Sequence, residues 1–130
     1  MGVKERATEL HESGFNCAQS ILCACGKYTG LDDASALAVS GGFGGGVRCG
    51  EICGALSGAV MAIGLANPYN NADDADAKDK IAALTRKCTG EFESEYGALR
   101  CEDLKASGYS CSELIEYAAE LAEKIICENK

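Results

Sequence analysis

The sequence predicts an all-α protein, a single compact domain over residues 1–130 with five to six helices and a glycine-rich loop entering the central helix. Two observations favour this class. Alanine and leucine dominate the apolar residues, whereas tryptophan is absent and Pro68 is the only proline. Several stretches repeat apolar residues at helical spacing, and none shows the alternation that is typical of a strand.

Two helices are expected at the start of the chain. Residues 3–12 form an amphipathic pattern that ends near Gly14. A second helix begins after Asn16, because Asn16 and Gln19 have the spacing of a capping box, in which each side chain bonds the other residue's backbone amide. This helix should extend to residue 28 and stop near Gly30.

The rest of the chain is expected to form three longer helices and two short elements. In order, these are a short helix over 34–40 capped by Asp32 or Asp33, a central helix over 49–67, a long helix over 74–95, a turn at 100–104 and a final helix from Ser110 onward. The central helix ends before Pro68, because a residue that precedes proline is disfavoured in the helical conformation. Ser110 and Glu113 repeat the capping-box spacing.

The charge balance excludes some partners. The chain has 12 basic and 20 acidic residues and a net charge of −8. We expect no nucleic-acid partner, because phosphate contacts require a basic face. The longest apolar run, 52–66, is shorter than the roughly twenty residues of a spanning helix, and the N-terminus lacks the pattern of a secretory signal. We therefore expect no membrane insertion and a cytoplasmic location.

Nine cysteines are the most informative part of the composition. Their number is odd, and a reducing compartment makes metal or redox chemistry a better explanation than a disulfide framework. No Cys-x-x-Cys pair occurs, and the single histidine, His11, is expected on the surface of a charged helix. The spacing is therefore not that of common zinc sites or of thioredoxin-like proteins.

Several cysteines fall at predicted helix starts. Cys17 follows Asn16 directly, and Cys111 stands in the same place at the start of the last helix. Cys49 and Cys53 lie in the first turns of the predicted central helix. A helix N-terminus presents free N–H groups and partial positive charge, which favour a thiolate over a thiol. These positions therefore suit metal binding or redox chemistry.

Arginines stand next to two of the cysteines. Arg48 precedes Cys49, and Arg100 precedes Cys101. Positive charge near a thiol favours the thiolate, the form that binds metals and attacks disulfides. Cys101 therefore joins the candidates that the helix starts provide.

The other cysteines have weaker signals. Cys23 and Cys127 lie within apolar helical runs, where core packing is the favoured role. Cys25 forms only a Cys-x-Cys pair with Cys23, and Cys88 is equally compatible with packing and with chemistry. The sequence does not assign a role to these four.

Three glycines would form a stripe along the central helix. Gly50, Gly54 and Gly58 are spaced four apart and so share one face of a helix. Each glycine in a helix interior costs about 1 kcal/mol relative to alanine. We expect either another helix or a cofactor to lie against the stripe, and an exposed stripe would also suit a homodimer. The glycines before it do not match a nucleotide loop, because no Gly-Lys-Ser/Thr follows and no strand precedes them.

These motifs resemble a known family. FNCAQS around Cys17 and GGGVRCGEICGALSGA around Cys53 are similar to the redox-active proteins named for the pattern C_GCAxxG_C_C, which are also similar to a domain of the split-Soret cytochromes. The resemblance covers nearly the whole chain, although the cysteine and first glycine of the central motif are in the opposite order to the family's label. The family's four defining cysteines would fall on Cys17, Cys53, Cys101 and Cys111. The resemblance implies a small helical fold, redox activity and iron–sulfur binding.

The leading hypothesis is a redox or electron-transfer protein that holds an iron–sulfur cluster on these four cysteines. Cys49 is a further candidate ligand, and the glycine stripe would let backbone approach the cluster. A redox partner protein is then expected. Two alternatives stay open: a metal-free thiol–disulfide protein that uses the same cysteines, and a structural zinc or interaction module. No motif identifies a substrate or a catalytic base.

Overall fold

The computed structural model describes residues 2–130 and is built from helices. They are α1 (Val3–Glu12), α2 (Cys17–Ala24), α3 (Gly26–Thr29), α4 (Asp33–Ser40), α5 (Gly54–Ala66), α6 (Ala75–Tyr96), α7 (Cys101–Ala106) and α8 (Cys111–Glu128). Six of them have seven or more residues, and no strand occurs within residues 2–130. The predicted all-α class and the number of longer helices are confirmed.

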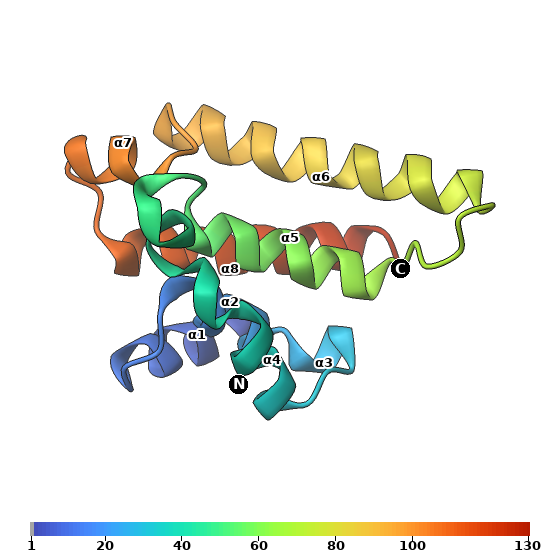
Figure 1. The fold of residues 1–130 in the computed structure, drawn as a ribbon, viewed down its shortest axis with the longest axis horizontal. Helices are drawn as coiled ribbons and strands as arrows, with labels where there is room; N and C mark the ends of the chain where they lie inside the picture. The colour runs from blue at the N-terminus through green and yellow to red at the C-terminus, as the bar shows by residue number, and fades with distance from the viewer. Residues whose placement is uncertain (1) are drawn as a thin grey trace.

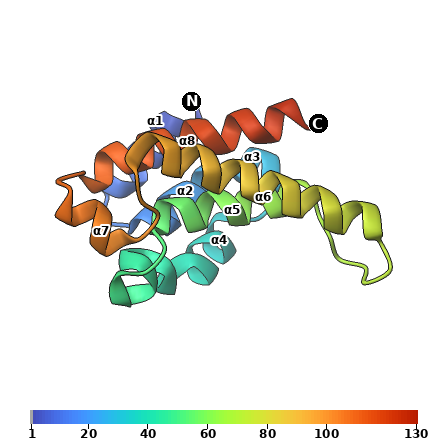
Figure 2. The same cartoon turned by 90° about the horizontal axis from the view of Figure 1, so that it is seen from above.

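Helices α5 and α8 pack against each other at the centre of the molecule (Figure 1). The long helix α6 covers them on one side, and α1 and α2 pack against them on the other. Helix α7 and the loops before α5 lie together at one end of this arrangement, as both views show (Figures 1 and 2). The N-terminal ends of α5 and α8 therefore point toward the same end of the molecule.

Small side chains allow this close packing. Ala55, Ala59 and Ala62 of α5 have no exposed surface, nor do Ala118 and Ala122 of α8. Because alanine adds only a methyl group, the backbones of neighbouring helices can approach closely, and apolar area is removed from water along the whole contact. The core is therefore alanine-rich at the centre of the bundle.

The predicted caps are present. The Asn16 side chain accepts a hydrogen bond from the Gln19 amide at 2.9 Å, and the Gln19 side chain accepts one from the Asn16 amide at 3.1 Å. Ser110 accepts a hydrogen bond from the Glu113 amide at 3.1 Å. These bonds satisfy free N–H groups at the starts of α2 and α8 and fix the positions of the cysteines that follow.

Three of the predicted elements differ in the structure. The second helix is interrupted at Cys25, whose φ of −85° and ψ of 10° separate α2 from α3. The predicted turn at 100–104 is instead the beginning of the short helix α7.

The central helix begins later than predicted. Residues before it form two short turns, η1 (Gly41–Phe43) and η2 (Gly46–Gly50), and α5 begins only at Gly54. Val47 and Arg48 have left-handed φ values of 57° and 61°, and Gly50 has a φ of 77°. A continuous helix cannot include these conformations, so the prediction of a helix from Cys49 is wrong.

Most cysteines outside the predicted site are buried. Cys23, Cys25 and Cys88 have no exposed surface, so a packing role fits each of them. Cys127 was predicted to pack in the core, but it is exposed, and its thiol donates a hydrogen bond to the Tyr28 hydroxyl at 3.5 Å. Cys127 lies on the solvent side of the last turn of α8, whereas Ile125 and Ile126 of the same turn are in the core, which explains the difference. All nine cysteines are free thiols in the structure.

None of the helices described over residues 2–130 combines the length and the apolar character that crossing a membrane requires.

Candidate functional site: a cavity lined by four cysteines

A cavity of about 170 Å³ lies at the end of the molecule where α7 meets the loops before α5. Its lining includes four thiols from four separate parts of the chain, namely Cys17, Cys53, Cys101 and Cys111. These are the four cysteines that the sequence analysis selected. The structure therefore brings together residues that are up to 94 positions apart in the chain.

Each of the four thiols stands at the start of a helix. Cys17 is the first residue of α2, and Cys101 and Cys111 are the first residues of α7 and α8. Cys53 is the residue immediately before α5. The N-terminal ends of four helices thus meet around one cavity, and their partial positive charges favour negative charge within it.

A short antiparallel contact holds Cys53 beside Cys101. The Cys53 amide donates a hydrogen bond to the Leu99 carbonyl at 2.9 Å, and the Cys101 amide donates one to the Glu51 carbonyl at 2.6 Å. These bonds flank an isolated bridge between Ile52 and Arg100. The two cysteines therefore occupy fixed positions on adjacent chain segments.

Salt bridges reinforce this contact and compensate the charge of Arg100. Its guanidinium lies 2.9 Å from Glu51, 3.3 Å from Glu102 and 3.6 Å from Asp103. Arg48 instead donates a hydrogen bond to the Gly41 carbonyl at 2.8 Å. The arginines that precede Cys49 and Cys101 thus interact with other groups. The helix N-termini therefore contribute more to the positive charge around the cavity than these two arginines do.

Two glycines of the predicted stripe lie against helix α2. A Cβ atom on Gly54 would stand 2.6 Å from the Cys17 sulfur, and one on Gly58 would stand 2.8 Å from the Ala18 carbonyl oxygen. Gly50 lies outside the helix, and a Cβ there would be 3.1 Å from the Glu102 side chain. The expected three-residue stripe is therefore a two-residue contact in α5, and its partner is a helix together with a thiol of the cavity.

Burial raises the thiol pKa values at two of the four positions. Removal from water raises the pKa of Cys53 to about 11, although the nearby backbone amides of Leu56 and Ala55 act in the opposite direction. Burial also raises the pKa of Cys111, while the charge of Lys105 lowers it. At these two sites the desolvation of the thiolate outweighs the effect of the helix N-terminus that the sequence analysis emphasised.

Further residues line the cavity that the sequence did not indicate. They are His11, Asn16, Gly45, Lys105, Tyr109 and Leu114. His11 is half-buried at the edge of this cavity, whereas the sequence placed it on an exposed face. No sequence motif marks His11 or Lys105, because only the packing of α1 and α7 around the cavity brings them there.

Cys49 does not line the cavity. It is exposed in η2, and its thiol donates a hydrogen bond to the Gly46 carbonyl at 3.5 Å. The left-handed backbone at Val47 and Arg48 directs this part of the chain away from the course of a regular helix. Among the five cysteines proposed as cofactor ligands, four are brought together and Cys49 is separate.

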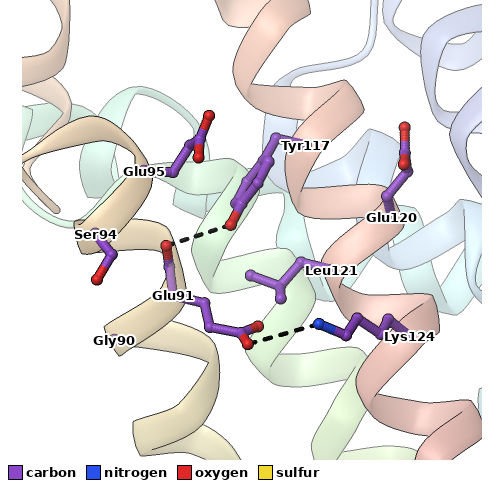
Figure 3. A pocket seen from close by; sticks show the side chains of 8 residues that line it. All are labelled: Gly90, Glu91, Ser94, Glu95, Tyr117, Glu120, Leu121 and Lys124. Carbon is purple, nitrogen blue, oxygen red and sulfur yellow. Dashed lines mark hydrogen bonds and ion pairs between the residues drawn. The ribbon is translucent and has the colours of Figure 1, made fainter.

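A larger hollow lies elsewhere in the described structure. It has a volume of about 540 Å³ and runs between α6 and α8, where Tyr117 donates a hydrogen bond to the Glu91 carbonyl at 3.2 Å and Lys124 pairs with the Glu91 side chain at 3.6 Å (Figure 3). No cysteine lines it. Among residues 2–130, no three side chains of the metal-binding types are arranged to hold a single metal ion.

A comparison with protein families identifies the family to which this chain belongs. The family described as "Putative redox-active protein (C_GCAxxG_C_C)" matches residues 15–125. The chain belongs to this family. The matched range includes all four cysteines that line the cavity of this C_GCAxxG_C_C protein. Comparisons with curated proteins and with solved structures gave no significant match.

Proposed function

We propose that this C_GCAxxG_C_C protein is an electron-transfer protein that binds an iron–sulfur cluster through Cys17, Cys53, Cys101 and Cys111. One observation carries the proposal: four thiols from four helices line a single cavity. Four cysteine ligands are the usual set for both [2Fe–2S] and [4Fe–4S] clusters. The donor set in the cavity therefore fits such a group.

The space between the thiols favours a group of several atoms over one ion. A single zinc ion draws four sulfur ligands to about 2.3 Å and leaves no space among them. The cavity here measures about 170 Å³, whereas one water molecule occupies about 30 Å³ in the liquid. A cluster uses this space, and a structural zinc site does not require it.

The surroundings of the thiols suit a negatively charged group. Thiolate-bound clusters carry negative charge, and the N-terminal ends of α2, α5 and α8 direct N–H groups toward the cavity. The backbone amides of Leu56 and Ala55, at the start of α5, favour the thiolate of Cys53 and act to lower its pKa. Hydrogen bonds to ligand sulfurs and exclusion of solvent are the means by which proteins set cluster potentials.

The same geometry makes thiol–disulfide exchange a weaker alternative. The attacking species in that exchange is a thiolate, and burial keeps Cys53 protonated at neutral pH because its pKa is raised to about 11. A bound metal displaces this proton, because metal ligands are deprotonated. The buried thiol of Cys53 therefore suits metal ligation better than reaction with an external disulfide.

In this account the chain holds and shields the redox group. When bound, an iron–sulfur cluster supplies one-electron oxidation and reduction. Cys53 and Cys101 are fixed by their backbone bonds, and Gly54 leaves the space that the Cys17 thiol occupies. A redox partner protein would deliver or receive the electron. In an experiment on the isolated protein, titration with a chemical reductant can replace this partner.

Iron and acid-labile sulfide analysis of protein purified without oxygen tests the proposal. We expect equal amounts of iron and sulfide, about two or four of each per chain, and a visible absorption that bleaches on reduction. One zinc per chain without visible absorption would support the structural alternative instead. A protein without metal whose thiol count rises on mild reduction would support the disulfide alternative.

A further inference from the structure

Charged residues are nearly absent from one continuous part of the chain. Residues 34–69 contain only Arg48 and Glu51 among the 32 charged residues of the protein. Because these two charges cancel, the rest of the chain carries the whole net charge of −8. The protein is therefore divided into a strongly acidic part and an almost uncharged part.

The uncharged part also presents apolar side chains to solvent. In the region that the structure describes, six large apolar side chains are exposed, and all of them lie in this part: Val39, Phe43, Val47, Ile52, Leu65 and Tyr69. Val39 is 56% exposed and Leu65 is 42% exposed, although both are on regular helices. Such clustering is unusual for a monomer and marks an interaction surface.

Two of these side chains, Val39 and Leu65, line a hollow between α4 and α5. It has a volume of about 460 Å³, and its lining contains no charged residue: Leu22, Leu31, Ser35, Val39, Met61, Gly64 and Leu65. We call these residues the apolar face. Helix α4 and the loops that follow it form the lower edge of the molecule in Figure 2, and α8 runs along the opposite edge.

The occupant of the apolar face is inferred from charge. A basic partner would find no acidic residues there, and an acidic partner would find no basic ones. An uncharged face is complementary to another uncharged face, and a second copy of the chain supplies one. Two copies that meet in this way bring together linings without charge. The nearest carboxylate in the sequence, Asp32, accepts a hydrogen bond from the Ser35 amide of its own chain, so the contact adds little repulsion between two chains of charge −8.

We propose that the protein forms a two-fold symmetric dimer through the apolar face. A two-fold interface places the same surface on both sides, so Val39 and Leu65 of each copy would be covered by the other. Gly64 assists close approach, because nothing outside its own helical turn lies within 4 Å of the position its Cβ would take. The dimer is independent of the cluster, since the apolar face and the cysteine cavity share no lining residue.

Sedimentation velocity of the full chain, purified without oxygen, tests this proposal. We expect a species of twice the 13.5 kDa chain mass at micromolar concentrations. Val39→Glu and Leu65→Glu should each weaken the dimer by about tenfold or more, because they place an unpaired charge in the interface. Ala83→Glu is the matched control, because it adds the same charge at an exposed position on α6 and should leave the dimer intact.

Added salt provides a second readout that needs no variant. Salt screens the repulsion between acidic copies, so association should strengthen from 20 to about 300 mM salt. A monomer at all concentrations would overturn the proposal. So would a dimer that Val39→Glu and Leu65→Glu leave unchanged, or one that Ala83→Glu weakens equally. Helical circular dichroism of each variant separates lost association from lost folding.

Discussion

The Cys101 amide donates a hydrogen bond of 2.6 Å to the Glu51 carbonyl, which joins the start of α7 to the chain just before Cys53. This bond and its partner from Cys53 to Leu99 connect two segments that are 48 residues apart. They place two thiols at the same cavity without a disulfide or a long strand. The backbone bonds thus fix the positions of these two thiols relative to each other.

The positions of Cys49 and Cys53 lead to opposite predictions for two similar variants. Cys53→Ser should abolish most iron binding, because Cys53 lines the cavity and its serine oxygen is a poorer ligand for iron than sulfur. Cys49→Ser should retain the wild-type iron content, because Cys49 is exposed outside the cavity. Iron and sulfide content per chain checks both. Equal iron loss in the two variants would contradict the separation of Cys49 from the site.

Gly58 is predicted to be necessary for the contact between α5 and α2. In Gly58→Ala the new methyl group would stand 2.8 Å from the Ala18 carbonyl oxygen, so the helices must separate. We expect the free energy of unfolding to fall by about 1–3 kcal/mol, as for other overpacked contacts. Urea unfolding measures the change.

Gly90 provides the control for this substitution. It lies within helix α6, and nothing is within 4 Å of the position of its Cβ. Gly90→Ala should therefore raise the free energy of unfolding by up to about 1 kcal/mol, because alanine favours the helix. Equal free energies of unfolding for Gly58→Ala and Gly90→Ala would contradict the close approach of α5 to α2 at Gly58.

Gly54 is predicted to affect the site more than the fold. A methyl group in Gly54→Ala would meet the Cys17 sulfur at 2.6 Å and displace that thiol from its position. We expect the variant to keep its helical circular dichroism and to lose much of its iron, whereas Gly90→Ala keeps both. Full iron content in Gly54→Ala would show that iron binding does not require the Cys17 thiol at this position.

Local signals in the sequence were enough to place some of these residues. The caps at Asn16 and Ser110 correctly put Cys17 and Cys111 at helix starts, because a capping box depends only on residues three apart. The start of α5 could not be predicted in the same way, because Val47 adopts a left-handed conformation that a β-branched residue rarely takes.

Long-range packing accounts for the rest of the site. The proximity of Cys53 to Cys101 depends on backbone hydrogen bonds between distant segments. No periodic pattern in the sequence indicates these bonds. The same holds for His11, whose helix reaches the cavity only through its packing on α2 and α8. The matched range of the family spans the four cysteines but does not reach His11.

The raised thiol pKa values predict that the metal-free protein loses stability at alkaline pH. Thiols of the unfolded chain ionise near pH 9, whereas burial raises the pKa of Cys53 to about 11 and that of Cys88 to about 12. Above pH 9 the native state therefore retains protons that the unfolded state has lost, so the free energy of unfolding falls as pH rises. Urea midpoints between pH 8 and 10.5, taken after removal of metal with a chelator, measure this.

Cys88→Ala is the internal check on that pH dependence. It removes one of the raised groups, so its urea midpoint should fall less steeply above pH 9 than that of the wild type. The midpoint at pH 7 should be lower because the buried thiol is lost. A midpoint independent of pH in both proteins would contradict burial as the cause of the raised pKa values.

The most direct measurement is a crystal structure of protein kept free of oxygen, with diffraction recorded on both sides of the iron absorption edge. The account predicts an iron anomalous peak inside the cavity, bonded to the sulfurs of Cys17, Cys53, Cys101 and Cys111. An iron peak at other residues would contradict it. So would a cavity without iron in which these four sulfurs are paired as disulfides or surround a single zinc ion.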